Sequence, residues 1–215
     1  MSQKITIYRG SQMIIEKPVF GTESPYSDYG LGFYCTREME LAKEWACGDE
    51  NGRFANQYDL DLSGLSIMEL SGETYNILNW LALLVNNRRF RLSNNIAAEG
   101  KSYLTSKFLP DISKFDVING YRADDSYFAF ANAFLNSALS LEQLAKAMRL
   151  GKLGEQTVLM TPQTFKQLQF VRSEPADRET YYPKRAMRDR EARDAYKKER
   201  SLQGTLDAVY ILDIM

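Results

Sequence analysis

The stretch 29–36, Tyr-Gly-Leu-Gly-Phe-Tyr-Cys-Thr, has two glycines at its entry and apolar or aromatic residues after them. It predicts a strand. Upstream, residues 4–10, Lys-Ile-Thr-Ile-Tyr-Arg-Gly, alternate, are β-branched and stop at glycine, which predicts an earlier strand that ends in a tight turn. The loop between these two stretches is rich in turn formers. The fold is therefore expected to start with two strands joined by a long loop.

Predicted helices and strands are mixed along the rest of the chain. We expect helices over 37–47, capped by Thr36, over 75–86, from Asp124 or Asp125 through Leu135, over 140–150 and over 162–167. We expect strands over 57–62 and 66–70, paired as a hairpin, and over 115–121, 156–161 and 168–171. This order lacks the strict alternation of a doubly wound sheet, so the predicted fold class is α+β.

The composition changes after Pro175. Residues 183–200 carry eight basic and four acidic side chains and predict a charged surface helix, and residues 206–215 are apolar enough for a terminal strand. We expect one domain over 1–172, with the helix and strand of 173–215 packed on it. The charged helix is interpreted either as a solvated face or as a surface for a partner.

The composition also excludes several kinds of chemistry. The chain has no histidine, which rules out Ser-His-Asp and Cys-His nucleophiles and His-containing zinc sites, and no metal is expected. A net charge of −1 argues against binding nucleic acid through overall charge. The two cysteines are expected to be free thiols, and the lack of a long apolar run or a signal peptide predicts a cytoplasmic protein.

Four segments in order carry a resemblance to a known family: 8–11 (Tyr-Arg-Gly-Ser), 29–36 with 42–46 (Ala-Lys-Glu-Trp-Ala), 120–127 (Gly-Tyr-Arg-Ala-Asp-Asp-Ser-Tyr) and 150–156 (Leu-Gly-Lys-Leu-Gly-Glu-Gln). Together they resemble the ADP-ribosyltransferase superfamily, and more closely a group of bacterial ADP-ribosyltransferase-like proteins often encoded beside antitoxin-like partners. The resemblance covers nearly the whole chain. It implies a split β-sheet core with flanking helices over 1–172 and NAD as co-substrate.

The resemblance assigns the first segment to the nicotinamide pocket. The backbone N–H and C=O of Gly10 would pair with the nicotinamide carboxamide, because no Cβ prevents a close approach. Arg9, between Tyr8 and Ser11, would hold the NAD ribose or a phosphate through its planar fork of donors. Without the later segments, the same residues are also typical of a strand that runs into a turn.

The second segment would supply the walls of that pocket. Tyr34 is the expected ring that stacks on nicotinamide, Tyr29 a second wall, Thr36 a nearby hydroxyl, and Gly32 a place of close ligand approach. The alternatives are a core aromatic for Tyr34 and a turn or bulge for the glycines.

The resemblance also implies a catalytic acid at the start of a late strand, which holds the ribose 2′-OH and stabilises an oxocarbenium-like state. Spacing aligns Gln156 with this position, where well-studied transferases have glutamate, and Glu155 is the alternative. Asp125 is a further site candidate that is equally suited to capping a helix. Arg88 and Arg89 either complement a helix dipole or bind phosphate.

These features predict a mono-ADP-ribosyltransferase that modifies a macromolecule, protein or nucleic acid, as a bacterial toxin or defence effector with a possible antitoxin partner. Two alternatives stay open. One is an NAD glycohydrolase, in which water attacks, and the other is a non-catalytic ADP-ribosyltransferase-like module that binds a nucleotide or a partner.

Overall fold

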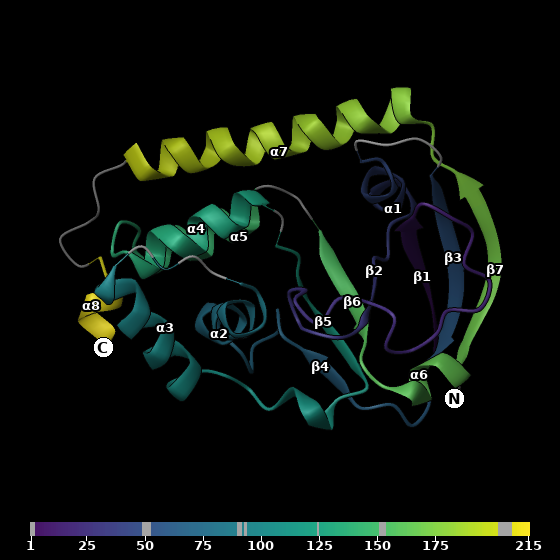
Figure 1. Cartoon of the computed structure of the whole chain (residues 1–215), viewed down its shortest axis with the longest axis horizontal. Coiled ribbons are helices and arrows are strands. Elements are labelled where there is room, and N and C mark those ends of the chain that lie inside the picture. Colours follow the sequence, from purple (N-terminus) through teal and green to yellow (C-terminus); the bar gives the residue numbers. More distant parts are fainter. Residues whose placement is uncertain are drawn as a thin grey trace.

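The structure is a computed structural model that describes residues 3–48, 53–89, 92, 94–123, 125–150, 154–201 and 208–215. For residues 125–127, 148–150 and 199–200 it describes the backbone alone. The described residues form two β-sheets with helices around them, a mixed α+β architecture as the sequence predicts (Figure 1).

The first sheet has three antiparallel strands in the order β1 (Lys4–Ser11), β3 (Phe54–Asp61) and β7 (Leu168–Pro175). Strand β7 continues past residue 172, the boundary expected from the sequence. The middle strand β3 is therefore bonded on both edges, whereas β1 has one edge left for another partner.

The second sheet has the order β2 (Phe33–Cys35), β6 (Glu155–Leu159), β5 (Val117–Tyr121) and β4 (Ile67–Glu69). Strand β4 runs parallel to β5, and the other pairs are antiparallel. Two backbone hydrogen bonds between Tyr8 and Thr36, of 2.8 and 2.9 Å, join the free edge of β1 to the end of β2.

The two sheets share a buried apolar layer. Phe33 of β2 and Tyr58 of β3 meet edge to face with their ring centroids 5.7 Å apart. Alternating side chains of the strands supply the rest of this layer, which consists of Ile7, Cys35, Leu60, Leu62, Val117 and Leu159. Burial of these faces holds the sheets against each other.

The opposite face of the second sheet is covered by helices α2 (Ile77–Asn87), α4 (Asp125–Leu135) and α5 (Leu141–Leu150), and α3 (Asn95–Lys107) packs on α2 and α4 (Figure 1). Helix α2 is apolar over most of its circumference, and Trp80 is fully buried with its indole N–H bonded to the carbonyl oxygen of Tyr121. A capping box between Ser140 and Gln143 starts α5. The second sheet is thus buried on both faces.

Helix α1 (Met39–Ala46) packs on the first sheet, and the long helix α7 (Arg178–Ser201) runs from α1 across to α4 and α5 (Figure 1). The Arg188 guanidinium makes two hydrogen bonds, of 2.8 and 2.9 Å, to the Glu44 carboxylate of α1. At the other end, the rings of Phe130 and Tyr196 stack with centroids 4.3 Å apart. The charged helix is therefore packed on helices that precede it in the chain.

Short elements complete the fold: the 3₁₀ turn Ile112–Lys114, α6 (Pro162–Lys166) and α8 (Ile211–Ile214). Within the described residues, no helix combines the length and apolarity that a membrane crossing requires. The same residues contain no group of three metal-ligating side chains.

The predicted hairpin of 57–62 and 66–70 is wrong, because β3 and β4 belong to different sheets. The Asp116 carboxylate accepts hydrogen bonds from the backbone N–H and hydroxyl of Ser66, both of 2.9 Å, and so draws the start of β4 to β5. Gly64 has a φ of +74°, which lets the chain turn away from β3.

The predicted terminal strand is also wrong, because Ile211–Ile214 forms α8. Asp213 accepts a hydrogen bond from the N–H of Tyr210, and Ile211 is buried beside α3. Thr36 does not cap α1, which begins at Met39, because its backbone is bonded to Tyr8. Helix α3 was not predicted, since its sequence is largely polar and buries few residues.

Gly10 lies where α1 crosses β1 without room for a side chain. A Cβ at this position would clash with the carbonyl oxygen of Ala42 and come within 2.7 Å of the backbone nitrogen of Ala46. Both contacts are backbone atoms, which cannot rotate away. The absent side chain is therefore required for helix packing.

We expect Gly10→Ala to lower the free energy of unfolding by at least about 2 kcal/mol, because α1 must shift to admit the methyl group. Urea denaturation followed by circular dichroism measures this loss. Gly48→Ala is the matched control, since the nearest atom to its Cβ would be the flexible end of the Arg185 side chain, 3.7 Å away. Equal stability of the two variants would contradict the packing assignment.

Candidate functional site

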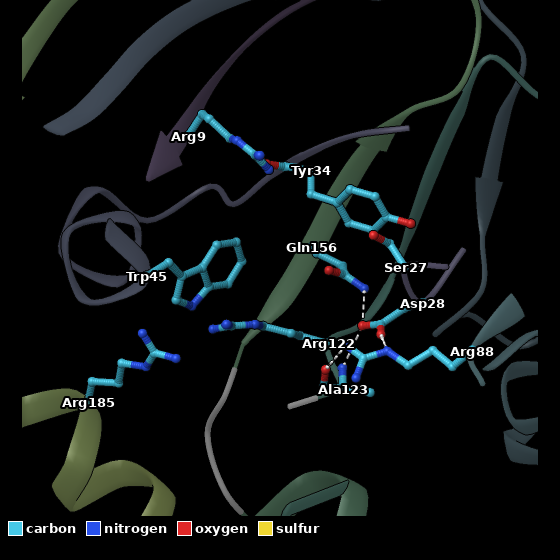
Figure 2. A pocket seen from close by; sticks show the side chains of 10 residues that line it. All are labelled: Arg9, Ser27, Asp28, Tyr34, Trp45, Arg88, Arg122, Ala123, Gln156 and Arg185. Carbon is cyan, nitrogen blue, oxygen red and sulfur yellow. Dashed lines mark hydrogen bonds and ion pairs between the residues drawn. The ribbon is translucent and has the colours of Figure 1, made fainter. Parts of the chain in front are cut away.

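A cleft of about 350 Å³ opens at the ends of β2 and β6, between α1 and α7 (Figure 2). Its lining comes from segments that are far apart in the sequence. They are Arg9 of β1, Ser27 and Asp28 of the loop before β2, Tyr34 of β2, Trp45 of α1, Arg88 after α2, Arg122 and Ala123 after β5, Gln156 of β6, and Arg185 of α7. Arg9, Tyr34 and Gln156, each a predicted site residue, thus share one cleft.

Strands β1 and β2 separate at this cleft. The Tyr8–Thr36 bridge is antiparallel, so the same register carried two residues further places Gly10 opposite Tyr34. A continued ladder would bond the N–H of Gly10 to the carbonyl oxygen of Tyr34. Instead that carbonyl accepts a 2.9 Å hydrogen bond from the Arg9 guanidinium. The N–H and C=O of Gly10 still face the β2 side, because hydrogen-bonding direction alternates along a strand.

Arg9 is held by other parts of the protein as well. Its guanidinium also contacts the Glu23 carboxylate at 2.6 Å, and its Cζ lies 5.2 Å from the centroid of the Phe33 ring. Both terminal nitrogens of Arg9 therefore have protein partners. Its main structural effect is to hold the loop before β2 and the edge of β2 against β1.

Tyr34 forms one wall of the cleft (Figure 2). Its hydroxyl donates a 2.7 Å hydrogen bond to the carbonyl oxygen of Gly30 and accepts one of 2.9 Å from the N–H of Tyr29. Burial raises the pKa of the hydroxyl well above its ordinary value, so the phenol stays neutral. The ring is consequently fixed in place and suited to stacking rather than to proton transfer.

Gln156 sits at the base of the cleft beside a buried carboxylate. Its side-chain N–H donates to Asp28 at 3.1 Å and to the carbonyl oxygen of Tyr121 at 3.3 Å. Because a carboxylate can only accept here, Asp28 fixes the amide with its nitrogen inward, and Figure 2 shows the amide oxygen on the side away from Asp28. The cleft therefore receives a hydrogen-bond acceptor from Gln156.

Asp28 is the centre of a larger network. Its carboxylate accepts a 2.9 Å hydrogen bond from the N–H of Ala123 and approaches the Arg88 guanidinium at 2.6 Å as an ion pair. Arg88 also donates to the carbonyl oxygen of Ala123 at 3.0 Å. This network joins the loop before β2, the end of α2 and the segment after β5.

The opposite end of the cleft is cationic and aromatic. The guanidinium of Arg122 lies over the Trp45 ring, 4.1 Å from its centroid, and the Arg185 guanidinium donates a 2.8 Å hydrogen bond to the carbonyl oxygen of Cys47. The lining residues include four arginines and one carboxylate, that of Asp28. This balance favours an anionic ligand.

Several other predicted site residues lie away from the cleft. The Tyr29 ring is fully buried and its hydroxyl donates to the carbonyl oxygen of Tyr121 at 2.6 Å, so it cannot form a second wall. Gly32 packs against β6, where a Cβ would come within 2.5 Å of Val158. The Thr36 hydroxyl is buried and accepts from the N–H of Glu38, 3.3 Å away.

Glu155 and Gln156 point to opposite faces of β6, because side chains alternate along a strand. Gln156 is buried in the cleft floor, and Glu155 is exposed. Ser11 bonds to the carbonyl oxygen of Met13 and accepts from Asn56, which supports the turn after β1. Tyr8 contributes its backbone to the bridge. The side chain of Asp125, and Asp124 as a whole, lie outside the described residues.

Sequence reasoning missed three residues that shape the cleft: Asp28, Trp45 and Arg185. In the sequence, Asp28 lies in a turn-rich loop, Trp45 within the predicted helix 37–47, and Arg185 in a helix whose charges suit any solvated surface. Phosphate binding is one of the two roles that the sequence suggests for Arg88, whereas the structure pairs Arg88 with Asp28. Each role depends on neighbours that are distant in sequence.

A family model described as a protein of unknown function (DUF3990) matches residues 5–170. The match contains all the cleft residues except Arg185. No curated protein and no solved structure matches the chain.

The buried ion pair at Asp28 gives the first prediction for this site. We expect Asp28→Ala to lower the free energy of unfolding by about 3 kcal/mol, because it leaves the Arg88 charge and the N–H of Ala123 without their acceptor. Chemical denaturation measures the loss. Asp194→Ala, which removes one partner of an exposed pair with Lys197, should leave stability unchanged. A stable Asp28→Ala protein would show that the network is dispensable.

The two cysteines give a second prediction. Cys35 is fully buried, which raises the pKa of its thiol to about 12, and burial also raises the pKa of Cys47. Since the thiolate is the reactive form, we expect neither thiol to react with a disulfide reagent at pH 8 in the native protein. Both should react after guanidinium denaturation. Rapid labelling of the native chain would contradict this assignment.

Proposed function

The chain belongs to the DUF3990 family, and we propose that it is a mono-ADP-ribosyltransferase that uses NAD to modify a macromolecule. The observation that carries this proposal is the convergence of Arg9, Tyr34 and Gln156 on one cleft from β1, β2 and β6. These three strands hold residues of three of the four segments that carry the resemblance to ADP-ribosyltransferases.

The separation of β1 from β2 supports a split-sheet, ADP-ribosyltransferase-like core. Beyond the Tyr8–Thr36 bridge, the N–H and C=O of Gly10 face a strand to which they are not bonded. A carboxamide carries one donor group and one acceptor group, and so matches this edge. In the proposed complex the nicotinamide amide would bond to Gly10 and its ring would stack on Tyr34.

The proposed reaction breaks the bond between the ribose C1′ and the nicotinamide nitrogen. The bonding electrons leave with nicotinamide, and a nucleophile of the acceptor attacks C1′ and releases its proton to solvent. Gln156 would accept a hydrogen bond from the ribose 2′-OH through its amide oxygen, which Asp28 orients. As a neutral amide it stabilises the developing positive charge less than glutamate would.

The Asp28 carboxylate compensates in part for this neutral amide. It lies 3.1 Å behind the Gln156 nitrogen, so its negative charge acts on the same end of the cleft, although the ion pair with Arg88 reduces the effect. This arrangement fits a slow transferase. We infer a role as a bacterial toxin or defence effector in the cytoplasm, held in check by an antitoxin-like protein.

Two alternatives differ in the fate of NAD. An NAD glycohydrolase would use the same cleft but let water attack C1′, and the openness of the cleft to solvent is compatible with it. A non-catalytic module would bind a nucleotide without cleaving it, and the neutral Gln156 favours this reading over a fast enzyme.

The decisive test incubates the purified chain with NAD labelled in the adenosine part and a bacterial lysate. We expect label on protein or nucleic acid, and we expect Gln156→Ala to lower the rate by about 100-fold, because it removes the acceptor at the ribose. Gln163→Ala is the matched control, since Gln163 lies on α6 and bonds to Gln167 at the surface. It should keep full activity.

Free ADP-ribose without labelled macromolecule would establish the glycohydrolase instead. Intact NAD whose binding is unchanged in Arg9→Ala and Tyr34→Ala would overturn both enzymatic functions. Intact NAD whose binding those variants abolish would point to the non-catalytic module.

A further inference from the structure

We propose that Glu23 is a built-in competitor for anionic ligands: it holds Arg9, and a phosphate group that enters the cleft displaces its carboxylate. The two side chains form an ion pair of 2.6 Å beside the cleft. The proposal deepens the proposed function by adding a regulatory contact to the NAD-binding cleft. It rests on that function only for the identity of the nucleotide, since displacement of Glu23 is tested with inorganic pyrophosphate.

The Arg9 guanidinium has one bond that fixes its position and one that a ligand can replace. Its Nη1 donates a 2.9 Å hydrogen bond to the carbonyl oxygen of Tyr34, and its Cζ lies 5.2 Å from the centroid of the Phe33 ring. Its Nη2 contacts the carboxylate of Glu23, whose side chain is 28% exposed and belongs to the loop before β2. An anion can therefore take the place of Glu23 while Arg9 keeps its bond to β2.

Glu23 lies in a segment whose other residues face solvent. Within residues 21–26, every residue except Glu23 is exposed. Gly21 has a φ of +86°, and a Cβ placed there would meet no atom within 4 Å beyond its chain neighbours. The chain therefore turns at Gly21 in open space, where a change of backbone conformation meets no obstacle.

The two ends of this segment are anchored independently of Glu23. On one side, Phe20 meets Phe165 edge to face with ring centroids 5.8 Å apart. On the other side, the guanidinium of Arg89 lies 4.0 Å from the centroid of the Tyr26 ring. Glu23 joins the middle of the segment to Arg9. Its release therefore frees the residues between Phe20 and Tyr26 without disturbing either anchor.

A phosphate group is well suited to replace Glu23. The planar fork of a guanidinium binds phosphate and carboxylate oxygens with the same geometry. The residues that line the cleft include four arginines and one carboxylate, so an anion inside the cleft is attracted by their summed charge. Both Arg9 and Glu23 are partly exposed, and water can solvate the carboxylate once it is released. The ion pair thus lowers the affinity of the cleft for anions without preventing their binding.

The test measures binding of inorganic pyrophosphate by calorimetry to the full chain and to Glu23→Gln. We expect the variant to bind about fivefold more tightly, because the competing carboxylate is gone. Glu16→Gln is the matched control, since it removes the same charge from an exposed position of the same loop, and its affinity should stay within about twofold of the unaltered chain. In an Arg9→Gln background, Glu23→Gln should bring no gain, because the two residues act as a pair. Circular dichroism confirms that each variant is folded.

A second measurement follows the Glu23 side chain directly in the unaltered chain. A glutamate-specific protease cleaves after Glu23 only when that side chain is released from Arg9. At constant ionic strength, we expect pyrophosphate to accelerate this cleavage about threefold, because the rate follows the population of the released state. Cleavage after Glu16 should keep its rate, and mass spectrometry distinguishes the two products.

The proposal is overturned by any of four results: no gain in pyrophosphate affinity for Glu23→Gln, an equal gain for Glu16→Gln, a gain that persists without Arg9, or cleavage after Glu23 that pyrophosphate does not change. Absence of pyrophosphate binding would overturn it as well. Failure of the proposed function looks different, because NAD then stays intact while the gain of Glu23→Gln still depends on Arg9. If both hold, Glu23→Gln lowers KM for NAD and leaves kcat nearly unchanged.

Discussion

The hydrogen bond from Arg9 to the carbonyl oxygen of Tyr34 is the interaction on which the cleft depends. It takes the place of the bond that Gly10 would make if β1 and β2 continued as one ladder beyond the Tyr8–Thr36 bridge. The two sheets are thereby joined at one point and separate beyond it. Because Arg9 also binds Glu23, the loop that leads into β2 is tied to the same place. The arginine at this position therefore opens an edge of β1 while both of its terminal nitrogens keep protein partners.

The far side of the cleft is built around a buried carboxylate. Asp28 is almost completely buried and has three partners, the N–H of Ala123, the side chain of Gln156 and the guanidinium of Arg88. Such a group is costly to remove from water, and its partners offset that cost. The Asp28 carboxylate fixes the loop before β2, the end of α2 and the segment after β5, and it orients the uncharged amide of Gln156. The cleft therefore receives from Gln156 a hydrogen-bond acceptor that carries no charge.

Helix α7 connects these features to the remaining cleft wall. By composition it is a surface helix, yet its contacts with Glu40 and Glu44 attach it to α1, and Tyr196 packs on α4. Arg185 thereby becomes part of the cleft, although it lies beyond the segment that matches the family model. The charged helix and the family domain thus contribute to one site.

The sequence by itself determined the α+β class, most helices and strands, the exclusion of histidine chemistry and the set of Arg9, Tyr34 and Gln156. Local patterns suffice for these, because periodicity and motif order are properties of neighbouring residues. The sequence did not determine how the strands pair. Residues 57–62 and 66–70 have the pattern of a hairpin, but Asp116 bonds to Ser66 and places β4 beside β5. Residues 211–214 have the pattern of a strand, but they form a helix whose Ile211 packs beside α3. Only the tertiary structure decided that Gln156 rather than Glu155 faces the cleft, that Tyr29 is a core residue, and that Asp28, Trp45 and Arg185 belong to the site. Each of these depends on which distant side chains come within hydrogen-bonding or packing distance, and local sequence does not encode those distances.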